Sequence, residues 1–281
     1  MDTFRFTAGD GTVLNFTTPI YLNSQDGEGM PPIDIQSQKA PFQDGDTLID
    51  QLFEPRRLTL NFTVTEITRA LYLTARRSIV QAMNPKLGTG TFRWVRDDGL
   101  TLDLNAVPED LAFLRGGIDW CQGRAILKAN NPFWHHPTGS AATLHALTGG
   151  LEFDIEFDIE FATVSGVTSV TNDGDVKCPF TATINGPCSN PKITSNTLGK
   201  FLKIELDLDA GESLSIDTEF GQKAITLISG GSTSNAMHYL SSDSEFFDLE
   251  PGVNSIEYTE ESFGSNAGSC VLGWIIRYLG G

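Results

Sequence analysis

The sequence predicts a mainly β protein with two domains: an α+β N-terminal β-sandwich with one helix and an extended hairpin, and an all-β C-terminal sandwich. The last hundred residues are a series of short apolar or alternating runs, each closed by Gly, Pro, Asn or Asp, as is typical of antiparallel strands joined by tight turns. Only one segment, in the first half, has the apolar period of a helix. A chain of 281 residues is long enough for two domains that each bury a core.

Charge is distributed unevenly along the chain. Residues 1–150 carry 13 Lys and Arg against 16 Asp and Glu, whereas residues 151–281 carry 6 against 20. Contacts with nucleic-acid phosphates or with anionic lipid need a basic surface, which the second half lacks. We therefore expect neither nucleic-acid recognition nor a membrane partner.

The first elements are strands. Residues 4–22 predict two strands on either side of a turn at 9–11, and the alternation at 57–65 predicts a half-buried strand. Between them, residues 23–47 are polar and rich in Gly, Pro, Asp and Gln. We predict a long connection there, of the kind that is usually functional in compact domains.

A helix is predicted from Glu66 to Met83, with Thr65 as its N-cap. Asn84 and Pro85 end it, because the residue before a proline avoids the α region. Arg69, Arg76 and Arg77 lie off the apolar stripe; contact with a partner is one interpretation, and a solvated helix face is the preferred one. The predicted stripe comprises Ile67, Leu71, Thr74, Ala75, Ser78, Ile79, Ala82 and Met83.

Residues 91–107 predict a hairpin with its turn at 97–99, and residues 118–130 predict another strand. Prolines and polar residues up to Pro137 indicate the end of the first domain, 1–137. The small, polar segment 138–150 is expected to be a linker, and 151–281 the second domain.

The second domain opens with a perfectly alternating strand at residues 153–161. Its acidic face suits a divalent cation or a basic partner, but a solvated edge that prevents sheet-to-sheet pairing is the preferred interpretation. Carboxylates held on one rigid strand rarely converge on one ion. The acidic face consists of Asp154, Glu156, Asp158 and Glu160.

No pattern in the sequence predicts catalytic, cofactor-binding or metal-ligating residues, so we expect no cofactor and no enzymatic activity. There is no GxSxG, HExxH, Walker or GxGxxG motif, and His135 and His136 are adjacent, which places them on opposite faces of a strand. Residues 207–212 are partly similar to a calcium loop but lack its remaining ligands, so a turn is preferred.

The four cysteines have no zinc-binding spacing. We expect reduced, buried thiols, with a bond between Cys178 and Cys188 across a hairpin as the alternative. The N-terminal residues lack the charge and apolar run of a signal peptide. The cysteines are Cys121, Cys178, Cys188 and Cys270.

Several short motifs occur together in a characteristic order. Asn131-Pro-Phe-Trp134 follows the helix and hairpin, and after it come Ile184-Asn-Gly186, Asn190-Pro-Lys-Ile193, the segment 211–217 and the segment 249–254. In order and spacing these resemble the distal tail proteins of long-tailed, siphovirus-type bacteriophages. The closing residues 275–281 also fit, whereas residues 1–50 match poorly and the strand 153–161 is particular to this sequence.

The resemblance implies a structural virion protein at the tail tip, assembled in the host cytoplasm. Its first domain would form a hexameric ring around the tail channel, and its second would be a galectin-like or jelly-roll β-sandwich outside the ring. The implied partners are further copies of the chain, the tail tube protein, and the tail-tip hub or baseplate and receptor-binding proteins. We expect the segment 23–47 and the hairpin 91–107, whose edge can pair with a neighbouring sheet, to make the ring contacts.

Two alternatives from other classes are a carbohydrate-binding module that contacts the host surface and a glycan-degrading enzyme. The carbohydrate-binding module would use an exposed aromatic side chain, for which Trp120, Trp134 and Trp274 are the candidates. Trp274 lies in an apolar strand and Trp134 follows Pro132 and Phe133, so both are expected to pack in the interior.

The charge asymmetry predicts that the acidic second domain projects outward, because six copies would repel one another around a tight axis. A chain that ends near Thr138 is then expected to assemble as the full chain does, with less dependence on salt. Measuring the mass of both forms at low and high ionic strength tests this expectation. A folded but monomeric truncated chain would contradict it.

Overall fold

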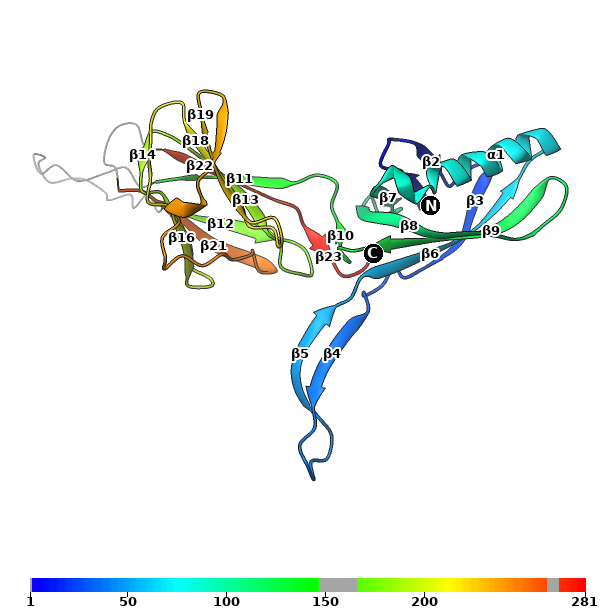
Figure 1. Cartoon of the computed structure of the whole chain (residues 1–281), viewed down its shortest axis with the longest axis horizontal. Helices are drawn as coiled ribbons and strands as arrows, with labels where there is room; N and C mark the ends of the chain where they lie inside the picture. The colour runs from blue at the N-terminus through cyan, green and yellow to red at the C-terminus, as the bar shows by residue number, and fades with distance from the viewer. Residues whose placement is uncertain (1, 147–165, 262–267) are drawn as a thin grey trace, which may run out of the picture. The chain divides into compact units, whose positions relative to one another are not determined.

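The structure, a computed structural model, describes residues 2–146, 166–261 and 268–281. It is mainly β, as predicted, and divides into two compact units, each described by itself (Figure 1). Unit 1 comprises residues 1–137 and 277–281, and unit 2 comprises residues 138–276. The acidic strand predicted at 153–161 lies outside the described residues.

Unit 1 is built on a nine-stranded antiparallel sheet in the order β2-β1-β7-β8-β9-β6-β3, to which β10 and β23 are attached. Its strands are β1 (Thr3–Thr7), β2 (Val13–Asn15), β3 (Ile20–Asp26), β6 (Arg56–Thr65), β7 (Gly90–Val95), β8 (Thr101–Gly116), β9 (Trp120–Ala129), β10 (Trp134–His135) and β23 (Arg277–Tyr278).

The long strand β8 connects the two halves of this sheet. Its first part pairs with β7, and after a register shift near Pro108 its second part pairs with β9. The alternating burial of β6, β7 and β9 places one face of each on a common core with the helix. The largest buried side chains of this core include Phe6, Phe62, Tyr72, Phe92 and Trp134.

The helix α1 (Arg69–Ala82) begins later than the sequence indicates. Thr68, not Thr65, is its N-cap and accepts a hydrogen bond from the Leu71 amide, because Thr65 still pairs with Trp120 at the end of β6. The stripe is also shifted in the first turn: Tyr72 is buried, whereas Ile67 and Leu71 are exposed. Its later part is confirmed by buried Ala75, Ile79, Ala82 and Met83, and the short η1 (Pro85–Leu87) follows, as the Asn-Pro signal predicts.

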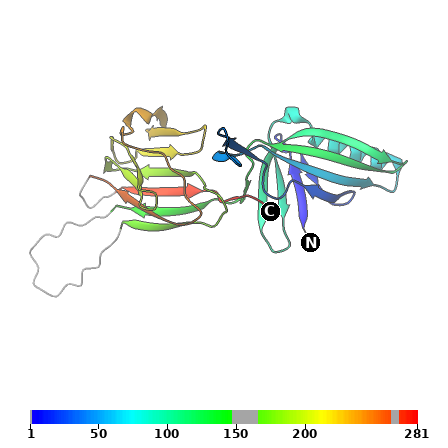
Figure 2. The same ribbon diagram turned by 90° about the horizontal axis from the view of Figure 1, so that it is seen from below.

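Part of the predicted connection 23–47 forms a second hairpin instead. The strands β4 (Ile33–Gln38) and β5 (Thr47–Phe53) pair only with each other and project from unit 1 as an arm, seen from the side in Figure 1 and from below in Figure 2. The prediction of a connection was wrong because this ribbon buries neither face, so its composition is polar. The hairpin predicted at 91–107 is present as β7 and β8; β7 also pairs with β1, and β8 continues along β9. Its contact with a neighbouring sheet stays a prediction.

Unit 2 is a sandwich of two antiparallel sheets, which lie one on the other in Figure 1. Six strands follow the order β11-β22-β13-β18-β19-β20 and four follow β12-β21-β15-β16, while β14 and β17 pair separately. The elements are β11 (Ser140–His145), β12 (Val167–Asn172), β13 (Phe180–Asn185), β14 (Cys188–Ser189), β15 (Lys192–Ser195), β16 (Lys200–Lys203), β17 (Asp207–Leu208), β18 (Ser213–Asp217), β19 (Ala224–Ser229), β20 (Ser232–Asn235), η2 (Met237–Tyr239), β21 (Gly252–Thr259) and β22 (Ser269–Trp274).

The motifs of the second half build turns. The buried Asn254 side chain accepts a hydrogen bond from the Glu250 amide and donates to the Glu250 and Gly252 carbonyls, which closes the turn before β21. Glu212 accepts a hydrogen bond from the Asp209 amide at 3.0 Å in the turn 209–212 between β17 and β18. The turn predicted at 207–212 is thus confirmed for its last four residues, whereas Asp207 and Leu208 form β17. These residues specify the fold and carry no chemistry of their own.

The predicted linker 138–150 is wrong for its described part. β11 pairs with β22 from Ser140 opposite Trp274 to His145 opposite Ser269, so these residues are an edge strand of unit 2. Small and polar residues suit a strand at the sheet edge as well as a linker, which is why composition did not separate the two. The chain also returns to unit 1 after Ile276, where β23 pairs with β10.

This return changes the expected behaviour of a truncated chain. A chain that ends at Thr138 loses β23, and we expect unit 1 to unfold about 10 °C lower than in a form that lacks only residues 138–276. In that form four Gly or Ser residues join Pro137 to Arg277. This short linker is sufficient because His135 pairs with Arg277 on adjacent antiparallel strands, so the two ends lie close together. Thermal unfolding followed by circular dichroism measures the difference, and equal unfolding temperatures would show that β23 is dispensable.

Candidate interaction site: the β4–β5 arm and its base

The described residues bring together no group of three or more His, Cys, Asp or Glu side chains that suits a metal ion. His135 lies in β10 opposite Asp103 of β8, and burial is the main cause that lowers its pKa. All four cysteines are buried and form no disulfide. Burial raises the pKa of Cys188 to about 11 and that of Cys270 to about 12, so these thiols are protonated at neutral pH and unreactive.

Within the described part of the chain, no helix combines the length and apolar composition needed to cross a bilayer.

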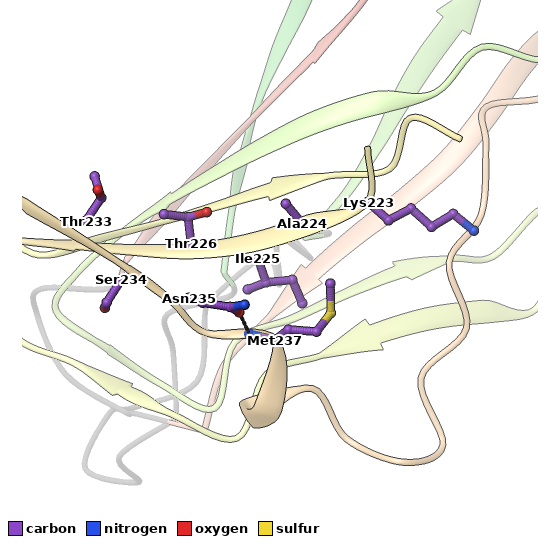
Figure 3. A pocket seen from close by; sticks show the side chains of 8 residues that line it. All are labelled: Lys223, Ala224, Ile225, Thr226, Thr233, Ser234, Asn235 and Met237. Carbon is purple, nitrogen blue, oxygen red and sulfur yellow. Dashed lines mark hydrogen bonds between the residues drawn. The ribbon is translucent and has the colours of Figure 1, made fainter. Parts of the chain in front are cut away.

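A shallow depression of about 290 Å³ lies along β19 and β20 of unit 2 (Figure 3). Hydroxyl and amide groups line it together with Lys223, Ile225 and Met237, and the Asn235 carboxamide oxygen accepts the Met237 amide hydrogen. None of the eight described residues that line it is aromatic. Trp274 is buried and Trp134 is fully buried, as predicted, so neither offers a stacking surface for a sugar ring.

The arm of unit 1 gathers several exposed apolar side chains on one element. Residues paired across an antiparallel ribbon share a face, so Ile33 with Phe53, and Ile35 with Gln51, define one side. Asp34 with Leu52, and Gln36 with Asp50, define the other. All seven residues of β5 and five of the six in β4 are exposed, including Ile35 at 61% and Leu52 at 50%.

A soluble monomer rarely carries a two-stranded ribbon that packs on nothing else. A two-stranded hairpin is marginally stable in water by itself, and large exposed apolar side chains gathered on one element mark an interaction site. Phe42 at the tip is fully exposed, and Met30 near the base is 63% exposed. The arm is therefore the surface of unit 1 best suited to be covered by another molecule.

The base of the arm is fixed by one buried cation, Arg56. Its Nε donates to the Pro132 carbonyl at 2.7 Å, one terminal nitrogen donates to the carbonyls of Gly27 and Gly29, and the other donates to the Leu279 carbonyl at 2.5 Å. The side chain is 1% exposed, and burial lowers its pKa to about 10, so it stays charged at neutral pH. One guanidinium thus joins the segment before the arm, the segment before β10 and the C-terminal segment.

Aromatic contacts support the same junction. Trp134 donates its indole hydrogen to the Glu28 carbonyl at 3.2 Å, and Arg56 lies 5.7 Å from the centroid of the Trp134 ring. Phe53, the last residue of β5, packs edge-on against Phe133 at 5.4 Å. Gly27 has a φ of 92°, and a Cβ there would lie 2.1 Å from the Arg57 carbonyl oxygen, so only glycine fits this approach to β6.

The expectation that the segment 23–47 is functional or mobile stays a prediction, and neither the burial of Arg56 nor the strand β5 was predicted. The alternation of Ile33, Asp34 and Ile35 was the available signal for the arm. Arg56 carried no signal of burial, because an arginine is almost never buried unless it is paired.

Two family models match the chain. One describes a siphovirus-type tail component, C-terminal domain, and matches residues 173–271; the other describes a phage tail protein RIFT-related domain and matches residues 9–93. No curated protein sequence matches.

Three solved structures are similar in fold. The Dit protein (gp 19.1) of SPP1, described as a paradigm of hub adsorption apparatus in phages that infect Gram-positive bacteria, aligns with a TM-score of 0.69 and 13% identity over 99% of both chains. A chain of the phage P2 baseplate in its activated conformation with Ca gives a TM-score of 0.53 at 8% identity over 98% of both chains. The same baseplate with Sr gives 0.50 at 8% identity over 96% of this chain and 98% of that chain.

Replacing Arg56 tests the junction at the base of the arm. Arg56→Ala should lower the free energy of unfolding of unit 1 by about 3–5 kcal/mol, because it removes a buried side chain and leaves four carbonyls without their donor. Hydrogen exchange of unit 1 peptides in the full chain measures the loss. Arg57→Ala is the control, since the side chain of Arg57 is 63% exposed and pairs only with Glu109; it should change the same quantity by about 1 kcal/mol or less. Equal effects of the two variants would contradict the role of Arg56.

Proposed function

The chain belongs to the distal tail proteins of siphovirus-type bacteriophages, and we propose that it forms a hexameric ring that joins the tail tube protein to the tail-tip hub or baseplate and the receptor-binding proteins. In this proposal unit 1 supplies the ring and unit 2 its periphery. The family supports a location in the tail of the virion, and the proposal includes assembly in the host cytoplasm.

The exposed arm carries the proposal. A ring needs a heterologous contact, in which one surface of a subunit meets a different surface of the next, so each subunit offers an element that it does not cover itself. β4 and β5 are such an element, because their apolar side chains are exposed in the single chain. Anchoring by Arg56 gives the arm a defined starting point, which reduces the entropy lost when it is ordered on a neighbour.

Charge favours the same assignment of roles. Residues 151–281 carry 6 basic and 20 acidic side chains, whereas residues 1–150 are close to balance. Bringing six strongly acidic units around a tight axis raises the free energy at low salt. Ring contacts made by unit 1 avoid this repulsion.

A carbohydrate-binding role has less support. The depression on β19 and β20 is open and has no aromatic side chain among its described lining residues, whereas sugar rings are commonly held by stacking. We also expect no hydrolytic activity, because the described acidic side chains form no cluster in an enclosed cavity.

Removing the arm tests the ring. A chain in which four Gly or Ser residues replace residues 33–53 should stay folded but remain monomeric at micromolar concentration, where the full chain assembles, because the apolar contact area is gone. Light scattering gives the mass, and negative-stain images show rings.

The matched control replaces only the turn residues 40–45 with Gly and Ser, which leaves both strands in place, and it should assemble. A full chain that is monomeric at high micromolar concentration and in the virion would overturn the proposal of a ring. Rings formed by the chain without its arm would exclude the arm as the contact.

A further inference from the structure

The proposed ring leaves open which surface receives the arm, and α1 offers a candidate. Between Arg69 and Ala82 the helix carries three arginines and no acidic residue. Arg69, Leu73, Arg76 and Val80 follow the i, i+4, i+7, i+11 spacing of a single flank, and Arg77 adjoins them. Leu73 is 47% exposed and Val80 51%, so this flank is both basic and apolar.

The three arginines of the flank differ in what they contact. Arg69 donates to the Ile118 carbonyl and lies 5.1 Å from the centroid of the Tyr72 ring, and Arg76 lies 4.1 Å from that of Phe113. Both therefore hold α1 to its own unit. Arg77 makes no hydrogen bond or ion pair within the part of the chain that the structure describes. Its charge is available to another molecule.

One face of the arm has the complementary pattern. Leu52 stands opposite Asp34, and Asp50 stands opposite Gln36 on the same face, so an apolar side chain lies between two carboxylates. Among the described residues neither carboxylate forms an ion pair; Asp50 accepts only the backbone amide hydrogen of Gln51. Residues 33–54 hold five acidic side chains and one lysine.

The two surfaces also match in length. The 14 residues of α1 extend about 21 Å, and the seven residues of β5 extend about 23 Å. A ribbon laid along the helix thus meets the flank from end to end. In this arrangement Leu73 and Val80 would contact Leu52, and Arg77 would lie beside the carboxylates.

We propose that the face of the arm with Asp34, Asp50 and Leu52 docks on the α1 flank with Leu73, Arg77 and Val80 of a neighbouring copy. The inference rests on the proposed ring, and it names the surface that closes it. The opposite face, with Ile33, Ile35 and Phe53, remains for a different neighbour in the tail. Opposite charges on two distinct patches make the contact heterologous, as ring closure requires.

Charge reversal in the full chain tests the contact. Arg77→Glu and Asp50→Arg, each alone, should raise the protein concentration at the midpoint of ring assembly about tenfold or more, because each places like charges together. The double variant should return the midpoint to within about threefold of the wild type. Arg115→Glu, an exposed arginine in β8, is the matched control and should leave the midpoint unchanged. Sedimentation velocity gives the midpoint, and circular dichroism verifies the fold of every variant.

The outcomes separate this inference from the proposed function. If the single variants assemble like the wild type while the chain without its arm stays monomeric, the ring stands and the α1 flank is not the receiving surface. If the single variants lose assembly and the double variant does not recover it, the direct pairing of these two faces is overturned. A wild-type chain that never assembles would overturn the ring and the docking surface together.

Discussion

The arrangement of unit 1 depends on the hydrogen bonds of one buried guanidinium. Arg56 donates to carbonyls from three parts of the chain that are far apart in sequence: Gly27 and Gly29, Pro132, and Leu279. A buried cation is stable only when its donors are satisfied, so these carbonyls must converge on it. Arginine suits this position because its planar fork offers donors in several directions at once, which a lysine ammonium does not.

This convergence links the arm to the rest of the unit. The segment 27–29 leads into β4, and Phe53 at the end of β5 rests on Phe133, so both strands leave a fixed platform. Beyond the platform, β4 and β5 pair with each other and with no further strand among the described residues. The base of the arm is therefore held in place, whereas its strands are exposed to a partner. An assembly element needs both properties.

Unit 2 shows a different relation between sequence and structure. Its motifs are turn residues, and their side chains close loops rather than line a site, as Asn254 does with the Glu250 and Gly252 backbone. A family signature made of such residues identifies a fold without identifying chemistry. That is why the motifs indicated the correct family although no catalytic or binding residue was predicted.

The sequence by itself determined the mainly β class, the strands at 57–65 and 118–130, the hairpin of β7 and β8, and the end of the helix at Asn84-Pro85. These follow from local rules: side-chain alternation, turn residues and the restriction that proline imposes. Only the tertiary structure decided that the segment 33–53 is a free arm, that β11 belongs to unit 2, that Tyr72 faces the core, and that Arg56 is buried. Each of these depends on partners distant in sequence, such as Leu279 for Arg56 and β22 for β11, and local patterns carry no information about such partners.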